Sequence, residues 1–229
     1  MADLAPEDMR ALDTRIRLRL LHNFIEHAWP LTTQELAGEF SSSLEQVSAS
    51  LHRLHQRRAL VLFPESDDVL MLHPFSAVPT AFRVEAEGRS WWASCAWCAF
   101  GIAALLGADT TIYTVCGSCQ RPIQWVVQSG VVAPTTDVIH FAAPPRDWWG
   151  DLAGACKQIL GFHSVDHAAQ WSELHGRQGA IVSVGQVWQL AQAWFADLRE
   201  PTPRSKTPEA MAAIFQRIGL IAPFWDVSR

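Results

Sequence analysis

Hydrophobic residues in the first seventy positions recur with the period of a helix and then with that of short strands. Apolar residues at three- and four-residue intervals run from Leu12 to Ile25, which predicts a first helix. Thr32 and Ser43, each followed three positions later by Glu or Gln, form capping boxes that start two further helices. The apolar runs 60–63 and 69–72 flank an acidic turn and predict a hairpin. Three helices and a hairpin are typical of a winged helix, so we expect a winged-helix-like module over residues 1–72.

The pattern changes after residue 79 to a mixture of strands and helices. The segment from His73 to Pro79 has a proline near each end and predicts an extended linker. Beyond it we expect strands over 81–87, 110–115, 123–127, 138–141 and 180–184, and helices over 95–106, 151–160, 165–175 and 186–198. A proline-containing segment after Pro201 leads to a last short helix. The sequence therefore predicts an α+β fold in three parts: the module over 1–72, a mixed α/β domain over 80–200, and a tail over 201–229.

Charge argues against a nucleic-acid partner for the winged-helix-like module. The chain carries a formal net charge of −5, whereas domains that bind DNA are usually basic. The predicted helix from Ser43 to Arg58 has its basic residues at its C-terminal end, although recognition helices present their N-terminal residues to the bases. We therefore expect a helical module that packs on the next domain, and DNA is not the expected partner.

Composition and the missing targeting signal indicate the cellular context. Hydrophobic residues make up 49% and charged residues 18% of the 229 positions, as in globular proteins. The segment Met1–Glu7 is acidic, unlike the basic start of a secretory signal. The longest apolar run, Ala96–Leu106, is much shorter than the roughly 20 residues of a membrane helix. We therefore expect a cytoplasmic protein without membrane association, whose five cysteines stay reduced and serve as metal ligands or nucleophiles.

Four of the five cysteines have the spacing of a zinc site. Cys95, Cys98, Cys116 and Cys119 form C-x2-C-x17-C-x2-C, which matches a site of four thiolates. The second pair encloses a glycine, as zinc knuckles do, but the first pair lies in a hydrophobic segment that runs into a helix. This spacing leaves open a non-catalytic winged-helix protein that binds zinc or senses a soft metal.

Cys156 stands outside that spacing. A lone cysteine on a helix is usually a core residue. The small Gly154 and Ala155 leave room beside its sulfur, and the cationic Lys157 favours a thiolate. By themselves these neighbours do not decide between a core residue and a reactive thiol.

Several short motifs, taken together, resemble the alkylmercury (organomercurial) lyase family. The segment Trp97–Phe100 is similar to the Trp-Cys-Ala-Leu sequence that opens the family's active-site helix. Cys116 and Pro122 resemble a cysteine and a proline around its next turn, and residues 179–184 resemble its closing strand. Cys156, followed by Trp171, is similar to its second catalytic cysteine. The resemblance covers roughly residues 82–198 and implies that the mixed α/β domain is alkylmercury-lyase-like.

The resemblance implies a carbon–mercury lyase. Mercury(II) is a soft metal that prefers thiolates, so Cys98 and Cys156 would bind it together while a nearby acid protonates the carbon. The family usually has an aspartate three residues after its first cysteine, where this chain has Gly101. Cys95, about one helical turn before Cys98, is then a candidate proton donor.

We therefore expect an alkylmercury lyase-like enzyme with Cys98, Cys156 and Cys95 as its catalytic residues. Its substrate is a small organometallic compound, it requires no cofactor, and it holds Hg(II) as a product that other thiols or a mercury-handling protein accept. Asp109 and Asp166 are further candidate donors, although such acids are more often solvated surface residues. Two alternatives stay open: the non-catalytic zinc or sensor protein, and a lyase for another carbon–heteroatom bond.

Overall fold

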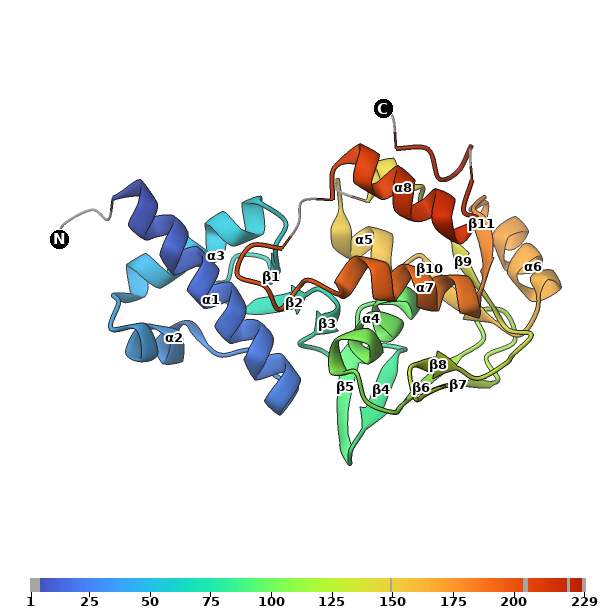
Figure 1. The fold of residues 1–229 in the computed structure, drawn as a ribbon, viewed down its shortest axis with the longest axis horizontal. Coiled ribbons are helices and arrows are strands. Elements are labelled where there is room, and N and C mark those ends of the chain that lie inside the picture. The colour runs from blue at the N-terminus through green and yellow to red at the C-terminus, as the bar shows by residue number, and fades with distance from the viewer. Residues whose placement is uncertain (1–4, 149, 204–205, 222, 228–229) are drawn as a thin grey trace.

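The computed structural model describes residues 5–148, 150–203, 206–221 and 223–227, which form a mixed α+β fold (Figure 1). Its helices are α1 (Pro6–His27), α2 (Thr33–Phe40), α3 (Leu44–Gln56), α4 (Ala96–Leu106), η1 (Pro145–Asp147), α5 (Leu152–Cys156), α6 (Val165–His175), α7 (Val184–Phe195) and α8 (Pro208–Ile218). Its strands are β1 (Val61–Leu62), β2 (Val69–Leu72), β3 (Phe75–Ser76), β4 (Arg83–Ala86), β5 (Arg89–Ala93), β6 (Thr110–Val115), β7 (Pro122–Gln128), β8 (Val131–Val132), β9 (Val138–Phe141), β10 (Ile159–Phe162) and β11 (Ala180–Ser183). No helix within the described ranges is long and apolar enough to cross a membrane.

The N-terminal part consists of α1, α2 and α3, followed by the antiparallel hairpin β1–β2. Both predicted capping boxes are confirmed. The side chains of Thr32 and Ser43 accept hydrogen bonds from the amides of Glu35 and Gln46, whose side chains bond back to the two cap residues. These bonds satisfy amides that a helix start otherwise leaves without a partner, and so they stabilise the starts of α2 and α3.

The basic residues of α3 are bound within the protein. Arg53 and Arg57 contact the buried carboxylate of Asp13 on α1, at 2.6 and 3.4 Å. His52 contacts Asp67, in the turn of the hairpin, at 2.8 Å. These ion pairs hold α3 against α1 and the hairpin, so these basic residues are bound within the N-terminal part.

The predicted linker after residue 72 is part of a sheet instead. Phe75–Ser76 forms β3, which pairs with β2 on one side and with β5 on the other. The eight-stranded sheet therefore continues in the order β1-β2-β3-β5-β4-β6-β7-β8. The linker prediction was wrong because the fully buried Phe75 holds this short strand in the sheet in spite of the neighbouring prolines. The bounds 1–72, 80–200 and 201–229 stay a prediction, and residues 1–4, 149, 204–205, 222 and 228–229 lie outside the described part.

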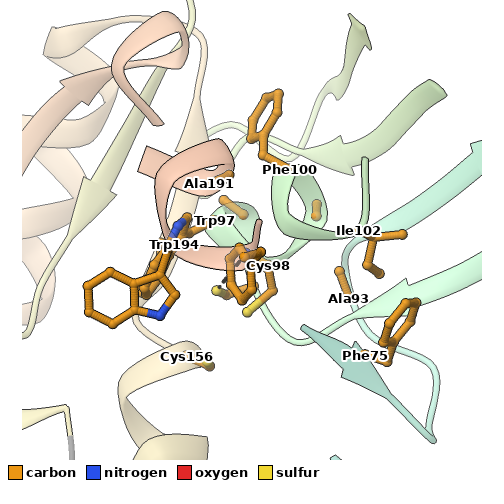
Figure 2. Packing of buried hydrophobic residues seen from close by; sticks show 14 of the residues in the cluster. Phe75, Ala93, Trp97, Cys98, Phe100, Ile102, Cys156, Ala191 and Trp194 are labelled. Carbon is orange, nitrogen blue, oxygen red and sulfur yellow. Dashed lines mark hydrogen bonds between the residues drawn. The ribbon is translucent and has the colours of Figure 1, made fainter. Parts of the chain in front are cut away.

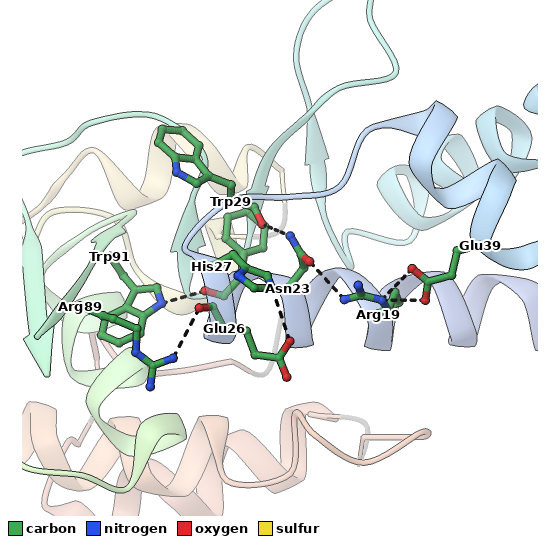
Figure 3. Close-up of polar contacts among 9 residues, drawn as sticks. Arg19, Asn23, Glu26, His27, Trp29, Glu39, Arg89 and Trp91 are labelled. Carbon is green, nitrogen blue, oxygen red and sulfur yellow. Dashed lines mark hydrogen bonds and ion pairs between the residues drawn. The ribbon is translucent and has the colours of Figure 1, made fainter. Parts of the chain in front are cut away.

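Helix α1 is fastened to this sheet by polar contacts at its C-terminal end (Figure 3). The indole Nε1 of Trp91, on β5, donates to the carbonyl of Phe24 at 2.7 Å, and this indole is buried. Arg89 on the same strand donates to the carbonyl of Glu26 at 3.4 Å. The N-terminal part therefore packs directly on the sheet.

A second, three-stranded sheet has the order β10-β9-β11. A single helix was predicted over residues 151–160, but α5 ends at Cys156 and Ile159–Phe162 forms β10. The prediction was wrong because a short strand that is buried on nearly every residue has no alternation to distinguish it from a helix. This correction matters for function, since it places Cys156 at the end of a helix rather than in its middle.

Helix α4 runs through the centre of the molecule and contacts α7 and strands of both sheets. Nine of its residues are buried. Trp97 packs against Trp194 of α7, with ring centroids 5.1 Å apart, and Cys98 lies beside these rings (Figure 2). The dense apolar packing fixes the start of α4, where the candidate site lies.

Candidate functional site

Three potential metal ligands meet at the start of α4. Cys98, Cys156 and His73 each offer one atom, and these atoms all lie within 4.8 Å of one another. The Sγ of Cys98 lies 3.7 Å from Nδ1 of His73, and the Sγ of Cys156 lies 3.4 Å from Nε2 of the same ring. Figure 2 shows the two cysteines on separate helices. The structure thus brings together the two cysteines that the family resemblance pairs.

Secondary structure positions each of these three residues. Cys98 is the third residue of α4, Cys156 is the last residue of α5, and His73 follows directly after β2. The start of a helix carries a partial positive charge, which favours a thiolate in the first turn. The position of Cys98 therefore suits a sulfur that binds a cation.

Cys95 adds a third thiol to this group. It is the N-cap of α4, and its Sγ accepts a hydrogen bond from the amide of Cys98 at 3.4 Å, a role that Ser, Thr or Asp usually has. Its sulfur also interacts with the thiols of Cys98 and Cys156. All three cysteines are buried. We call Cys95, Cys98, Cys156 and His73 the thiol cluster.

The thiols of the cluster hold their protons unequally. Burial raises the pKa of Cys95, but hydrogen bonds to its sulfur from Cys156 and Cys98 outweigh burial and bring this pKa well below its usual value. Burial raises the pKa of Cys98, and the hydrogen bond that Cys156 makes to Cys95 raises the pKa of Cys156. Burial lowers the pKa of His73, which favours its neutral ring. Among the three thiols, Cys95 is therefore the one whose surroundings favour the thiolate most.

A cavity of about 360 Å³ reaches this cluster from the side of the N-terminal part. Cys156 and His73 line it. Its other walls include aromatic rings and three arginines of the N-terminal part: Trp97, Trp148, Trp194, Phe195, Arg17, Arg57 and Arg58. A cavity of this size with mostly apolar walls suits a small organic molecule.

Gly101 lies where the family resemblance would place an aspartate, and the structure leaves no space for one. A Cβ atom at Gly101 would lie 2.5 Å from Cε2 of Phe195, far closer than two carbon atoms approach. Phe195 is itself buried and packs on Trp97. The ring of Phe195 therefore occupies the place of the missing carboxylate, and the proton must come from another group.

The two acids considered as alternative donors lie elsewhere. Asp109 is exposed and accepts a hydrogen bond from the amide of Ser129 at 2.7 Å. Asp166 is exposed in the first turn of α6. Neither carboxylate joins the buried thiols.

One expectation for the surroundings of Cys156 was wrong. Lys157 is exposed, and the pKa of Cys156 is raised rather than lowered. Gly154 itself has no room for a side chain, because a Cβ there would clash with the carboxylate of Asp151, which caps α5. Cys156 owes its place to the end of α5 and not to a cationic stretch of sequence.

Cys116 and Cys119 belong to a different group. Their sulfurs lie with His167 within 4.8 Å of one another. The four cysteines of the zinc-like spacing are therefore divided between two groups in the described part of the chain. Cys119 is exposed, and hydrogen bonds from Arg121 lower its pKa.

Sequence reasoning missed both histidines of these groups, His73 and His167. His73 comes from the segment that was taken for a linker, and His167 lies in a helix remote from the turn with its cysteines. The only local signal was that each histidine sits at the end or start of a predicted element. Which cysteines these histidines contact depends on how the two sheets pack. The spacing of residues along the sequence does not show that packing.

The fold and the cluster define a class of thiol protein that can bind a soft metal beside a cavity for an organic group. The family model described as alkylmercury lyase (MerB) matches residues 75–196, which is more than half of the 229 residues. The chain belongs to the alkylmercury lyase family, whose members are enzymes that cleave carbon–mercury bonds. The family resemblance drawn from the sequence is confirmed.

Individual relatives agree with this assignment. The chain is 24% identical to an alkylmercury lyase of Staphylococcus epidermidis over 178 residues, which cover 76% of this chain and 79% of that protein. An alkylmercury lyase of Bacillus cereus is also 24% identical, over 76% of this chain and 78% of that protein. A crystal structure of the mercury-bound form of MerB2 superposes with a TM-score of 0.66 and 25% identity, covering 84% of this chain and 99% of that one.

Proposed function

We propose that this chain cleaves the carbon–mercury bond of a small organomercurial by protonolysis, and that Cys98 and Cys156 hold the mercury. The observation that carries the proposal is the meeting of these two buried thiols beside a cavity with aromatic walls. Two thiolates are the ligands that Hg(II) prefers. The organic group of the substrate would bind against the aromatic walls of this cavity.

The reaction balances without a cofactor. A substrate R–Hg–X meets two thiols, each of which exchanges its proton for a bond to mercury. The carbon–mercury bond breaks with its electron pair on carbon, one thiol proton forms the new C–H bond, and the other leaves with X. The products are R–H, HX and Hg(II) held by two sulfurs. No electron acceptor is needed, because the reaction involves no external oxidant.

Cys95 is our candidate for the group that moves the proton. It interacts with the thiols of both Cys98 and Cys156, so it can receive the proton that either one loses on binding mercury. As a neutral thiol it can then give this proton to the carbon. His73, which also contacts both sulfurs, would keep them aligned and screen the charge that develops.

The N-terminal part would act as a wall of the substrate cavity. We assign it as a winged-helix-like module that packs on the sheet, because its basic residues Arg53 and Arg57 are paired with Asp13 rather than presented to DNA. Free thiols or a mercury-handling protein would accept the Hg(II). We place the enzyme in the cytoplasm, since the reaction consumes reduced thiols.

A single-turnover reaction with phenylmercury tests the proposal. The reduced protein should release benzene, detected by gas chromatography, whereas Cys98→Ser and Cys156→Ser should release none above the rate without protein. Asp109→Asn is the control, because this exposed acid lies away from the cluster and should leave the rate unchanged. The proposal fails if the wild-type protein forms no benzene while both serine variants still retain mercury as well as it does.

A further inference from the structure

The turn between β6 and β7 carries a second set of metal-ligand atoms, apart from the thiol cluster. The Sγ of Cys116 lies 3.4 Å from Nδ1 of His167, and the Sγ of Cys119 lies within 4.8 Å of both. Cys116 is buried, whereas Cys119 is exposed. The set therefore has one buried ligand and an open side that faces solvent.

Backbone hydrogen bonds hold this turn in shape. The amide of Cys116 donates to the carbonyl of Arg121, and the amide of Gln120 donates to the carbonyl of Cys116, both at 2.9 Å. Gly117 donates to the carbonyl of Gly161 on β10 at 3.0 Å. A Cβ at Gly117 would lie 2.8 Å from the ring of Phe162, so only glycine lets the turn pack this closely on β10. The two cysteines are thus held in place by the fold.

Helix α6 positions the third ligand from another part of the chain. His167 is its third residue, and the amide of His167 donates to the side chain of Ser164, the cap of this helix. His163 lies close by, with its ring centroid 6.3 Å from that of His167 and its Nδ1 3.2 Å from a carboxylate oxygen of Asp137. The capped start of α6 therefore holds the imidazole of His167 in place beside the two cysteines.

We infer that Cys116, Cys119 and His167 form a second metal site that binds Zn²⁺, independently of the thiol cluster. Zinc takes tetrahedral sites of sulfur and nitrogen with bonds of about 2.0–2.3 Å, so neighbouring ligand atoms lie about 3.5–3.8 Å apart. The separation of 3.4 Å between Sγ of Cys116 and Nδ1 of His167 is only about 0.1 Å below this range. Three protein ligands leave one position on the open side for water or an external ligand.

The site joins segments that are distant in sequence. It ties the β6–β7 turn to α6, and α6 packs against β9 and β10. A bound Zn²⁺ would therefore stabilise the part of the fold that follows Cys156. This role needs no organomercurial, so the site can be tested whether or not the chain is a lyase.

Zinc analysis of the full-length reduced protein, purified without added metal, tests the inference. We expect stoichiometric zinc in the wild type and in the double variant Cys98→Ser/Cys156→Ser, which removes two thiols of the other cluster. Cys119→Ser and His167→Ala should lose most of this zinc and show at least roughly tenfold weaker binding in competition with a chelator. Circular dichroism checks that each variant is folded, and the exposed Cys119 is the safer position to change.

Cobalt substitution gives a second readout. Co²⁺ in this site should show the charge-transfer absorption of thiolate ligands, and Cys119→Ser should weaken it. The inference is overturned if the wild type holds no zinc and takes none up from buffered Zn²⁺, or if Cys119→Ser and His167→Ala keep it. It is equally overturned if the Cys98→Ser/Cys156→Ser variant loses the zinc, because the metal would then lie in the thiol cluster. Binding of Hg²⁺ but not Zn²⁺ at Cys116 and Cys119 would also contradict it.

Discussion

Gly101 in the middle of α4 and Phe195 at the end of α7 fit each other closely. The glycine removes the carboxylate that the family resemblance leads one to expect, and the ring of Phe195 fills the space. The glycine was visible in the sequence, but the ring that replaces the acid was not, because it comes from α7. The sequence paired Cys98 with Cys156, which the structure brings together, but it could not show what surrounds them.

Restoring the acid should therefore fail unless the ring is also removed. Gly101→Asp should lower the free energy of unfolding by about 1–3 kcal/mol through overpacking alone, and Phe195→Ala by about 3–5 kcal/mol through the lost ring. The double variant should be clearly more stable than the sum of the two losses predicts, because the small alanine makes room for the aspartate. Urea unfolding of the four proteins measures this coupling. Strict additivity would show that the two side chains do not compete for the same space.

Cys95 should matter for proton transfer more than for holding mercury. Cys95→Ala should lower the single-turnover rate on the order of 100-fold, since a positioned acid contributes about that much. Retention of Hg(II) should change little, because Cys98 and Cys156 remain. Asp166→Asn is a control that changes an exposed acid and should leave both quantities unchanged. A normal rate in Cys95→Ala would rule out Cys95 as the proton carrier.

At the scale of elements, periodicity predicted the long helices and the alternating strands well. The sequence placed α6 within its observed bounds and β6 and β7 to within about a residue. It missed β3, β5, β8 and β10. These strands are short or lack alternation, and they are held by pairing with neighbouring strands rather than by local preference. The site depends on two of them, since His73 precedes β3 and Cys156 precedes β10.

The second sheet should give the protein a measurable sensitivity to acid. His140 on β9 is almost fully buried, and burial lowers its pKa to about 4. An unfolded histidine has a pKa of about 6.5, so the unfolded chain binds more protons between these values. Stability is therefore complete above pH of about 6.5 and falls as the pH drops toward 4, by up to about 3 kcal/mol.

Comparison with a non-titrating side chain isolates this contribution. His140→Gln should lose less stability than the wild type between pH 7.5 and pH 5 in urea unfolding, even if it is less stable at pH 7.5. The other histidines are the same in both proteins, so their contributions cancel in the comparison. An equal loss in both proteins would show that His140 does not bear the acid sensitivity.

At the scale of the whole molecule, the cavity exists because the N-terminal part packs on the sheet. Residues of α1 and of the turn after α3 form one wall, and α4, α5 and α7 form the other. The division into three parts stays a prediction from the change of pattern in the sequence. The continuous sheet across residues 73–79 and the shared cavity were not, because both arise from contacts between distant segments.

Arg58 allows a test of that wall. It lines the cavity, is exposed, and has no ion-pair partner among the described residues, whereas Arg57 is paired with Asp13. Arg58→Ala should raise the KM for a carboxylated arylmercurial roughly twofold to fivefold relative to phenylmercury, as expected for loss of one exposed charge contact. Arg10→Ala, an exposed arginine of α1 outside the cavity, is the matched control. A ratio of KM values that does not change would show that the N-terminal wall does not contact the substrate.

The proposed lyase depends on Cys98 and Cys156 holding the mercury together. The most direct measurement is the Hg(II) retained by the chain after reaction with phenylmercury and rapid gel filtration with one equivalent of a small monothiol. We expect nearly stoichiometric Hg(II) on the wild type, and almost none on Cys98→Ser or Cys156→Ser, because a single thiolate holds Hg(II) less firmly than a pair. Stoichiometric retention by either serine variant would contradict it.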